Sequence, residues 1–381
     1  MKTKLPGIGT TIFTVMSKLA ADVGAINLSQ GYPDFNAPAE LIDLLSQYMR
    51  DGYNQYPPMS GVEALRAQVR EKCERLYGCA ADAEHEITIT SGATEAIFVA
   101  VQAMIHAGDD VIVLDPAYDS YDPAVTMAGG TVQHVPLAAP DFSVDWDRVR
   151  AAIKPNTRLL MVNSPHNPTA TVFDATDLDA LELLLQDFDL HIVSDEVYEH
   201  MVFDGAPHQS LLTRPALASR AFVISSFGKT YHATGWKVAY CVAPAVLTAE
   251  FRKVHQFVTF TTHTPTQWAL ATYMERHPEH YAELAEFYQA KRDLFRAELV
   301  ASGFRLLPSA GTYFQLADYS AFGNEPDVDF VRYLTTEVKV AAIPVSVFYK
   351  ESSQDAIIRF CFAKDDDTLR EAASRLRGIS R

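Results

Sequence analysis

Two stretches of this sequence, Ser194-Asp195-Glu196-Val197-Tyr198 and Ser225-Ser226-Phe227-Gly228-Lys229-Thr230, decide its fold. Each follows an apolar run, at 190–193 and at 221–224, that is typical of a buried strand. In an open α/β sheet, ligands bind outside the carboxyl ends of the strands. The sequence therefore predicts an aspartate, a tyrosine and a lysine at the ligand-binding edge of one sheet.

Two other interpretations of the lysine motif are excluded by neighbouring residues. Gly228-Lys229-Thr230 could end a phosphate-binding P-loop, but that motif needs a glycine at position 223, where this chain has valine. Ser226 and Lys229 fit the S-x-x-K of penicillin-binding proteins, but the companion motifs of that family are absent. The remaining alternative is that Lys229 is a loop residue that is exposed to solvent. The residues at the other strand ends are needed to distinguish this alternative from a ligand-binding role.

The composition is that of an ordinary soluble enzyme. The chain has 381 residues, 48% hydrophobic and 21% charged, and its length predicts about two domains. Its formal net charge of −16 disfavours nucleic acid and anionic membranes as partners. Its 4 cysteines show no metal-binding spacing, so we expect reduced thiols and no metal site. Without a signal-peptide core or a membrane-length apolar stretch, the protein is expected to be cytoplasmic.

The order of elements predicts an α/β fold with a mostly parallel sheet in a large domain, followed by a smaller α+β domain. We expect the large domain at 39–275 and the small domain at 1–38 together with 276–381. Strands are predicted at 86–90, 111–114, 158–162, 190–193 and 221–224, with helices at 93–106 and 177–186. After residue 265 the sequence predicts a long helical region at 266–300, within which a helix begins at Pro278. Strands are then predicted at 304–307, 313–316, 338–342 and 357–362.

Two further strand ends carry residues suited to a ligand. The strand at 158–162 leads into residues 163–169, where two prolines stiffen the loop around Asn167. The strand at 86–90 leads into residues 91–94, small residues at a helix start whose N–H groups suit a phosphate. Taken alone, residues 91–94 are more often a plain helix cap at Ser91 or Thr94.

Four polar groups thus follow three successive strands. Asn167, Asp195, Tyr198 and Lys229 are separated by 28, 3 and 31 residues, which fits βα units and one turn. Pyridoxal phosphate chemistry needs such groups: an amine forms the imine, a carboxylate pairs with the pyridinium nitrogen, and hydroxyl and amide groups contact the phenolate oxygen. The sequence therefore predicts pyridoxal 5′-phosphate as cofactor.

These motifs resemble those of the pyridoxal-phosphate aminotransferases of class I and II, which share the aspartate-aminotransferase fold type I. The resemblance runs almost the full length of the chain and is closest to the methionine-preferring and kynurenine- or glutamine-type branch. It is carried by residues 28–35 (LSQGYPDF), 56–61 (YPPMSG), 163–170 (NSPHNPTA), 194–198 (SDEVY), 225–229 (SSFGK), 234–238 (TGWKV), 254–256 (VHQ) and 358–360 (IRF).

The resemblance implies a role for each candidate residue. Lys229 would hold the cofactor as a Schiff base and move the proton at the substrate Cα, while Asp195 would pair with the pyridine nitrogen. Tyr198 and Asn167 would contact the phenolate oxygen. Further cofactor contacts would come from Gly92, Ala93, Ser226 and Lys237 at the phosphate, from Tyr118 stacked on the ring, and from Tyr56 of a second subunit. Substrate contacts would come from Gly31, Tyr32, Asn167 and Arg359.

Arg359 is the expected clamp for the substrate carboxylate. Strand alternation at 357–362 places it among apolar neighbours, where a guanidinium needs an anionic partner, although an arginine reaching solvent from a strand edge is the alternative. Two residues depart from the family pattern. Lys237 stands where many members have arginine and supplies charge without the bidentate fork. Ala170 replaces a frequent glycine, so we expect a different backbone angle in that turn.

The sequence thus predicts an aminotransferase that moves the amino group of an L-amino acid to an α-keto acid. Methionine is the first expected donor, with aromatic amino acids, kynurenine and glutamine behind it. A homodimer with active sites shared between subunits is expected. The alternatives are a β-lyase acting on cysteine S-conjugates, a regulatory module that binds the cofactor without turnover, and an acyl-CoA-using synthase of the same fold. The filled catalytic positions and the carboxylate clamp disfavour the last two, whereas the β-lyase stays open.

Overall fold

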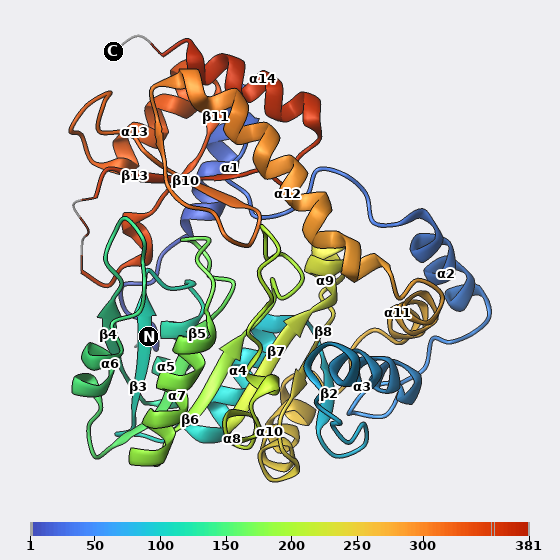
Figure 1. Cartoon of the computed structure of the whole chain (residues 1–381). Helices are drawn as coiled ribbons and strands as arrows, with labels where there is room; N and C mark the ends of the chain where they lie inside the picture. Colours follow the sequence, from blue (N-terminus) through green and yellow to red (C-terminus); the bar gives the residue numbers. More distant parts are fainter. Residues whose placement is uncertain (1–2, 352, 354, 380–381) are drawn as a thin grey trace.

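The computed structural model describes residues 3–351, 353 and 355–379, which form two main sheets with helices around them (Figure 1). The larger sheet has seven strands in the order β2-β8-β7-β6-β5-β3-β4. Only β8 runs in the opposite direction to the other strands of this sheet. The predicted α/β fold is confirmed. The strands are β2 (Ile87–Thr90), β3 (Asp110–Asp115), β4 (Thr131–Pro136), β5 (Thr157–Asn163), β6 (His191–Asp195), β7 (Ala221–Ser226) and β8 (Ala239–Val242).

Helices cover both faces of the larger sheet. In β3, Val111 and Val113 pack on one face, whereas Ile112 and Leu114 pack on the other. Because both faces are buried, apolar residues succeed one another along the strands, which explains the continuous runs in the sequence. One face carries α4 (Ala93–Met104), α5 (Tyr121–Ala128) and α10 (Ala245–Val258); the other carries α2 (Ala39–Arg50), α3 (Glu63–Tyr77), α6 (Trp146–Ala152), α7 (Ala175–Asp187), α8 (Pro215–Ala218) and α11 (Thr264–Arg276).

The sequence analysis missed β4 and β8. The edge strand β4 is only partly buried, so its side chains do not form a continuous apolar run. The four-residue β8 follows a long irregular segment that contains α9 (Phe227–Thr230) and the 3₁₀-helix η2 (Thr234–Trp236). Both strands are recognisable only through pairing with distant partners.

The smaller sheet is antiparallel and confirms the strands predicted after residue 300. Its order is β12-β13-β10-β9, and a separate two-strand parallel pair joins β1 to β11. The strands of the smaller sheet are β9 (Arg305–Leu306), β10 (Phe314–Asp318), β12 (Ile343–Pro344) and β13 (Ile357–Cys361), and the separate pair is β1 (Ile26–Asn27) with β11 (Val340–Ala341). The helices on this side are α1 (Ile12–Val23), α13 (Asp327–Tyr333) and α14 (Asp366–Arg377), with the short helices η3 (Val300–Ser302), η4 (Leu334–Val338) and η5 (Ser346–Phe348). The short helix η1 (Leu211–Thr213) packs in the core of the larger sheet.

The helical region predicted at 266–300 consists of two helices, and the helix start predicted at Pro278 lies two residues from the observed one. The chain forms α11 and then α12 (His280–Leu299), which leads from the larger sheet to α14 in Figure 1. Pro278 lies between the two helices, and a proline cannot donate the backbone hydrogen bond that helix continuation requires. The side chain of His277 contacts Glu40 at 2.8 Å and Glu279 at 3.0 Å, which ties the break to α2.

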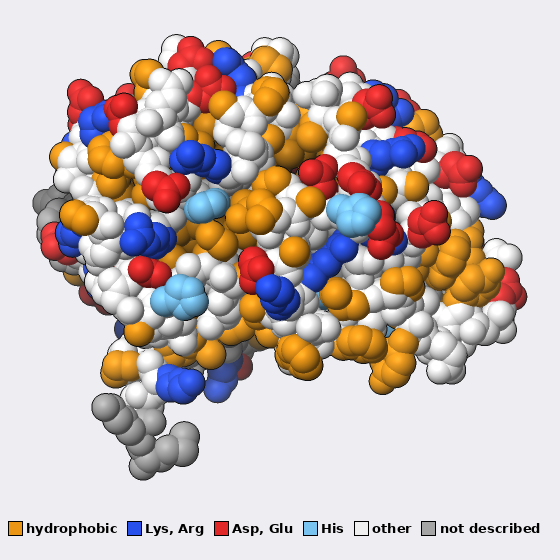
Figure 2. Space-filling model, turned by 90° about the horizontal axis from the view of Figure 1, so that it is seen from below, with side chains coloured by type: hydrophobic (Ala, Val, Ile, Leu, Met, Phe, Trp, Pro, Cys, Tyr) orange, Lys and Arg blue, Asp and Glu red, His pale blue; other side chains and the backbone are white. Residues whose placement is uncertain are grey.

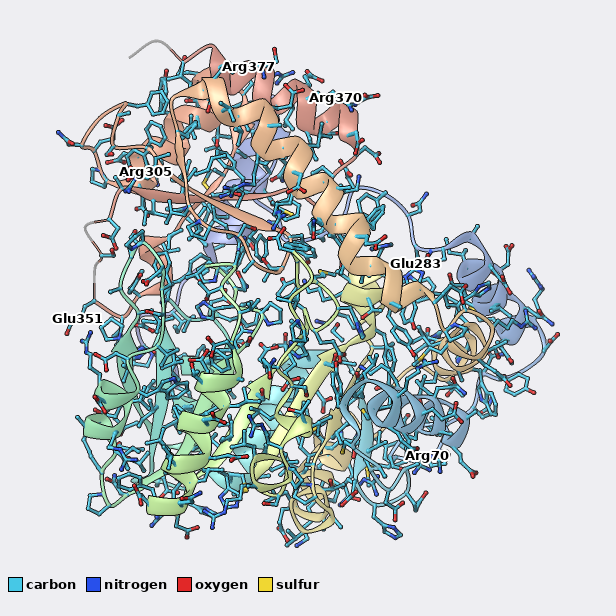
Figure 3. The ribbon with its side chains drawn as sticks, viewed as in Figure 1. Arg70, Glu283, Arg305, Glu351, Arg370 and Arg377 are labelled. Atoms are coloured by element: carbon cyan, nitrogen blue, oxygen red, sulfur yellow. The ribbon has the colours of Figure 1, made fainter. Side chains whose placement is uncertain are left out.

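The surface carries charges of both signs among apolar side chains. On the face seen in Figure 2, basic and acidic groups are interspersed and do not form one basic patch. Arg370 and Arg377 of α14 lie on the outer side of the molecule, far from the strand ends of the larger sheet (Figure 3). Within the described ranges, no helix is long and apolar enough to cross a membrane, and no group of three potential ligands could hold a metal ion.

A buried carboxylate joins several elements beneath the carboxyl ends of the larger sheet. Glu199, which is 4% exposed, accepts hydrogen bonds from Lys72 at 2.6 Å and from Tyr240 at 2.8 Å. Tyr77 and Ser225 donate to it as well. These partners come from α3, β7 and β8, so the carboxylate locks the segment after β6 against three other elements.

Replacing Lys72 by methionine is expected to lower the free energy of unfolding by about 3–5 kcal/mol at pH 7, because it leaves Glu199 buried without its charge partner. Burial alone would raise the pKa of Glu199, but the charges of Lys72 and His200 outweigh burial and lower it below the ordinary 4.5. A lowered pKa stabilises the fold only above the unfolded value, so the loss should shrink as the pH falls below 4.5. Urea unfolding at several pH values measures both effects.

Arg150→Met is the matched control for this loss. Arg150 pairs with Asp187 at 2.6 Å on the surface, where both side chains are exposed. An exposed pair contributes at most about 1 kcal/mol, so this variant should unfold nearly like the wild type. Equal losses in Lys72→Met and Arg150→Met would contradict the role given to Glu199.

Candidate functional site

A cavity of about 310 Å³ lies at the carboxyl ends of β5, β6 and β7, on the side of the larger sheet that faces the smaller sheet (Figure 1). It brings together residues that are up to 346 positions apart in the chain, from Phe13 to Arg359. The sequence-predicted residues that line it are Gly31, Gly92, Ala93, Tyr118, Asn167, Asp195, Tyr198, Ser226, Lys229, Lys237 and Arg359.

Two predicted site residues do not line the cavity. Tyr32 is half exposed, and its ring lies 5.0 Å from the ammonium nitrogen of Lys364. Tyr56 is 81% exposed and packs its ring at 5.4 Å from that of Phe260. The described chain therefore does not bring Tyr56 to its own cavity, and the predicted role of this residue in a second subunit stays a prediction.

Asp195 is the only carboxylate among the lining residues. Its Oδ2 accepts a hydrogen bond from the hydroxyl of Tyr121 at 2.7 Å. The side chain of Asn163, at the end of β5, donates to the Asp195 backbone carbonyl at 2.7 Å and so fixes the end of β6. Burial raises the pKa of Asp195 to about 6, against which the Tyr121 hydrogen bond acts only partly. A cationic partner in the cavity would offset that unfavourable burial.

The amine of Lys229 lies in the same cavity as Asp195. Its Nζ donates to the carbonyl oxygen of Gly31 at 3.1 Å and to the hydroxyl of Tyr313 at 2.8 Å. Burial lowers the pKa of Lys229 to about 8, which makes its amine more often neutral than that of a surface lysine. The preceding Gly228 lets this turn pack closely, since a Cβ there would lie 3.0 Å from the Cα of Thr234.

An anion-binding corner forms where α4 begins. Gly92 has a φ of +89°, and a Cβ on it would lie 2.9 Å from Cε and 3.0 Å from Nζ of Lys237. Glycine at this position therefore lets the Lys237 ammonium lie against the N-terminus of α4, where backbone N–H groups and the helix dipole attract anions. The hydroxyl of Ser226 lines the same cavity. Ammonium, N–H and hydroxyl donors together suit a phosphate group.

Arg359 is fully buried, and its charge has no carboxylate partner among the described residues. Its guanidinium donates to Asn167 Oδ1 at 2.5 Å and to the Ser29 carbonyl at 3.2 Å. The ring of Phe314 lies 3.9 Å from its central carbon, and its Nε–H has no hydrogen-bond partner in this structure. Because arginine can only donate, the Asn167 oxygen is committed to it, and the Asn167 NH₂ group remains for a ligand.

The turn after Asn167 keeps the backbone angle that glycine would give it. Ala170 has a φ of +62°, which lies in the left-handed region, and its side chain is buried. The expectation that alanine changes this turn is therefore wrong. The Ala170 N–H donates to His166 O at 2.8 Å, and its carbonyl accepts from Ala310 and Gly311 at 3.0 Å, so tertiary contacts hold the unfavourable angle.

Four cavity-side residues were given no role by the sequence analysis. Tyr121 and Tyr313 support Asp195 and Lys229 from 74 and 84 positions away, so no local motif marks them. Phe13 and Phe314 line the cavity beside Arg359. The only available signal was that Tyr121 belongs to the strand-end segment that also contains Tyr118.

Comparisons with known proteins agree with this site. The sequence profile described as "Aminotransferase class I and II" matches residues 23–376. The chain is 50% identical to a methionine aminotransferase of Escherichia coli over 99% of this chain and 98% of that protein. It is 40% identical to a probable N-succinyldiaminopimelate aminotransferase of Mycobacterium tuberculosis over 98% of this chain and 97% of that protein.

A solved structure gives the same result. The crystal structure of YbdL from E. coli, whose reactivity identified a methionine aminotransferase function, superposes with a TM-score of 0.98 at 50% identity. The match covers 100% of this chain and 99% of that one. The fold is thus shared along the whole chain.

Replacing Asp195 by asparagine is expected to stabilise the ligand-free protein by about 1–3 kcal/mol at pH 7.5. A raised pKa means that stability is full below the unfolded value of 3.8 and is lost as the pH rises through about 6. The rise from 3.8 to about 6 corresponds to roughly 3 kcal/mol above pH 6. Asparagine retains an acceptor for Tyr121 without the charge, and urea unfolding at pH 7.5 and 4.5 measures the difference.

Asp189→Asn serves as the control, because Asp189 is exposed and lies 3.7 Å from Arg220. A surface change of this kind is expected to alter stability by less than about 0.5 kcal/mol at either pH. If Asp195→Asn is no more stable than the wild type at pH 7.5, the ionised carboxylate is not the unfavourable group that its burial indicates.

Proposed function

The chain belongs to the class I and II aminotransferases, and on that premise we propose that it transfers the amino group of L-methionine to an α-keto acid at the cavity around Lys229. The family uses pyridoxal 5′-phosphate. When bound, this cofactor forms an imine with amines and withdraws electrons from the substrate Cα through its ring. The single observation that carries the proposal is the buried, uncompensated Arg359 in the same cavity as Lys229 and Asp195.

The residues present fit that cofactor. The corner formed by Gly92, Ala93, Ser226 and Lys237 suits its phosphate, because a Cβ at position 92 would fill the space beside the ammonium. The raised pKa of Asp195 reflects a buried carboxylate that a protonated pyridine nitrogen would compensate. Tyr198 and the NH₂ group of Asn167 are donors suited to the phenolate oxygen, and Tyr118 offers an aromatic face.

Lys229 is proposed to hold the cofactor covalently through Nζ and, once released, to take the proton from the substrate Cα. Its lowered pKa of about 8 supplies neutral amine near physiological pH, which both roles require. Asp195 stays ionised at that pH when a cation lies against it. The side chains of Tyr121 and Asn163 keep the carboxylate and the end of β6 in place.

Arg359 is proposed to bind the α-carboxylate of the substrate. A carboxylate accepts charge-assisted hydrogen bonds from a guanidinium, with one such pair often bidentate. Asn167 and the Phe314 ring fix the plane of the guanidinium, and the free Nε–H shows that its donors are not all used by the protein. The amino group of a bound amino acid would then point toward Lys229 in the same cavity.

Methionine is the proposed donor because the space beside Arg359 is aromatic and uncharged. The rings of Phe13, Phe314 and Phe348 lie 5.5, 3.9 and 5.7 Å from the guanidinium carbon. A thioether side chain makes favourable contacts with aromatic rings, whereas a second carboxylate would need a cation there. Apart from Arg359, the cations that line the cavity are Lys229 and Lys237, which have other proposed roles. The 50% identical methionine aminotransferase supports this choice.

We also propose the predicted domain division, a homodimer and a cytoplasmic location. Hydrophobic clusters that are formed mostly within each part support the division into residues 39–275 and residues 1–38 with 276–381, although Leu307, Leu316, Val345 and Ile357 pack in the cluster of the larger part and Tyr198, Met201 and Phe203 in that of the smaller. Residues 1–2, 352, 354 and 380–381 lie outside the described structure. An apolar surface supports the homodimer: Tyr56 and Phe257 are 81% and 86% exposed and lie near the half-exposed Val258 and Phe260. Tyr56 would complete the phosphate corner of the partner's site.

The function is tested by keto-acid formation from L-methionine, from L-aspartate and from N-succinyl-LL-diaminopimelate with a common α-keto acid acceptor. We expect kcat/KM for methionine to exceed the other two values by at least about 100-fold, which is the discrimination that an unpaired buried charge can supply. Lys229→Ala should reduce the rate below detection, whereas Lys253→Ala on the surface should not change it. Equal rates on methionine and aspartate, or full activity of Lys229→Ala, would overturn the proposal.

Arg359→Met is expected to raise KM for L-methionine by about 10- to 100-fold, because charge-assisted hydrogen bonds to the carboxylate are lost. Steady-state kinetics with 3-(methylthio)propylamine, which has the same side chain but no carboxylate, provide the control. For this amine the variant and the wild type should react at similar, low rates. A large loss with the amine as well would place the role of Arg359 in the fold of the site and not in carboxylate binding.

A further inference from the structure

Tyr313 is a fully buried tyrosine next to β10 whose hydroxyl lies against the amine of Lys229. Lys229 Nζ lies 2.8 Å from Tyr313 Oη and 3.1 Å from the carbonyl oxygen of Gly31. Tyr313 Oη also lies 2.5 Å from that carbonyl and donates its single proton to it, because a carbonyl can only accept. Toward Lys229 the tyrosine is therefore an acceptor.

The number of acceptors matches a neutral amine. A neutral amine has two N–H donors and one lone pair, whereas an ammonium has three N–H donors. The Gly31 carbonyl and the Tyr313 hydroxyl satisfy two donors, and the described residues offer Lys229 no third acceptor. Burial lowers the pKa of Lys229 to about 8, which acts in the same direction. The bound amine thus keeps its lone pair uncommitted.

The position of Tyr313 is fixed by its surroundings. Its ring packs against Tyr198 at 5.1 Å, Phe314 at 5.0 Å and Tyr288 at 5.6 Å. Gly31 lies two residues after Ser29, whose carbonyl accepts a hydrogen bond from Arg359. A Cβ at Gly31 would lie 3.0 Å from the Phe314 ring, so the chain is closely packed there. Both acceptors therefore belong to rigid parts of the smaller-sheet side, while Lys229 comes from the larger sheet.

We propose that Tyr313 and the Gly31 carbonyl form a docking site for the free amine of Lys229, which the amine occupies whenever it is not bonded to the cofactor. The inference rests on the proposed function, which makes Lys229 the cofactor lysine. When the substrate amine has displaced Lys229, the docked Nζ takes one proton from the substrate Cα with its lone pair. The electron pair of the broken C–H bond would pass into the ring of the bound cofactor. Nζ would then give the proton to the cofactor carbon that is bonded to the substrate nitrogen and return to the neutral amine. Tyr313 is thus a positioning residue for Lys229.

The first test uses the full chain prepared without cofactor and measures acetylation of Lys229 by trace acetic anhydride between pH 6 and 10. Tyr313→Phe removes one acceptor, and acceptors stabilise an ammonium more than an amine. We therefore expect the midpoint for Lys229 labelling to move to lower pH by about 0.5–1 pH unit. Tyr288→Phe is the matched control, because its hydroxyl contacts His232 at 3.0 Å in the same aromatic cluster. Its midpoint should equal that of the wild type.

The second test is kinetic and uses the cofactor-loaded enzyme. In Tyr313→Phe the amine of Lys229, which takes the proton, is no longer held in place. We therefore expect kcat on L-methionine to fall by about 10- to 100-fold, with KM changed less than about threefold. Tyr288→Phe should stay within about twofold of the wild-type kcat. A labelling midpoint that Tyr313→Phe leaves unmoved would overturn the docking site.

Two further measurements keep the outcomes distinct. If Tyr313→Phe does not fold, 3-fluorotyrosine at position 313 weakens the acceptor at nearly constant shape, and the midpoint should again move to lower pH. An unmoved midpoint with this residue would overturn the proposal equally. Pyridoxal 5′-phosphate should protect Lys229 from acetylation in wild type and variant; loss of protection in the wild type would instead refute Lys229 as the cofactor lysine.

Discussion

The structure of the site depends on one constraint, which is that three ionisable side chains lie in one cavity without pairing with each other. Lys229 is held by a hydroxyl and a carbonyl, Asp195 by the hydroxyl of Tyr121, and Arg359 by an amide oxygen and a carbonyl. Neutral partners orient these groups without forming ion pairs with them, so each group remains available to a ligand. Burial in this arrangement raises the pKa of Asp195 and lowers the pKa of Lys229.

Glu199 and Lys72 show the opposite arrangement a short distance along the chain. Their charges are paired at 2.6 Å and surrounded by hydroxyl donors, which leaves nothing for a ligand to compensate. The pair joins α3 to the strands that carry Ser226 and the segment that carries Tyr198. Glu199 and Lys72 are thus paired with each other inside the fold. Asp195, Lys229 and Arg359 have no such partner in the cavity.

Residues of the smaller-sheet side complete a site whose main groups come from the larger sheet. Gly31, Tyr313, Phe314 and Arg359 reach the cavity from segments at both ends of the chain. Arg359 and the amine of Lys229 are linked to neighbouring carbonyls, those of Ser29 and Gly31. The group that would bind the substrate carboxylate and the group that would move its proton therefore share one backbone segment as support.

The sequence by itself determined the strand ends that carry Asn167, Asp195, Tyr198 and Lys229, because buried parallel strands are continuous apolar runs and their carboxyl ends share one edge. The family resemblance added Lys237, which lines the same cavity as Gly92. Pro278 marked the start of the helix that follows α11. Only the tertiary structure decided the strands β4 and β8 and the positive φ of Ala170. It alone showed Tyr121 and Tyr313 as supports, since their hydrogen bonds span 74 and 84 residues and leave no periodic or local trace in the sequence.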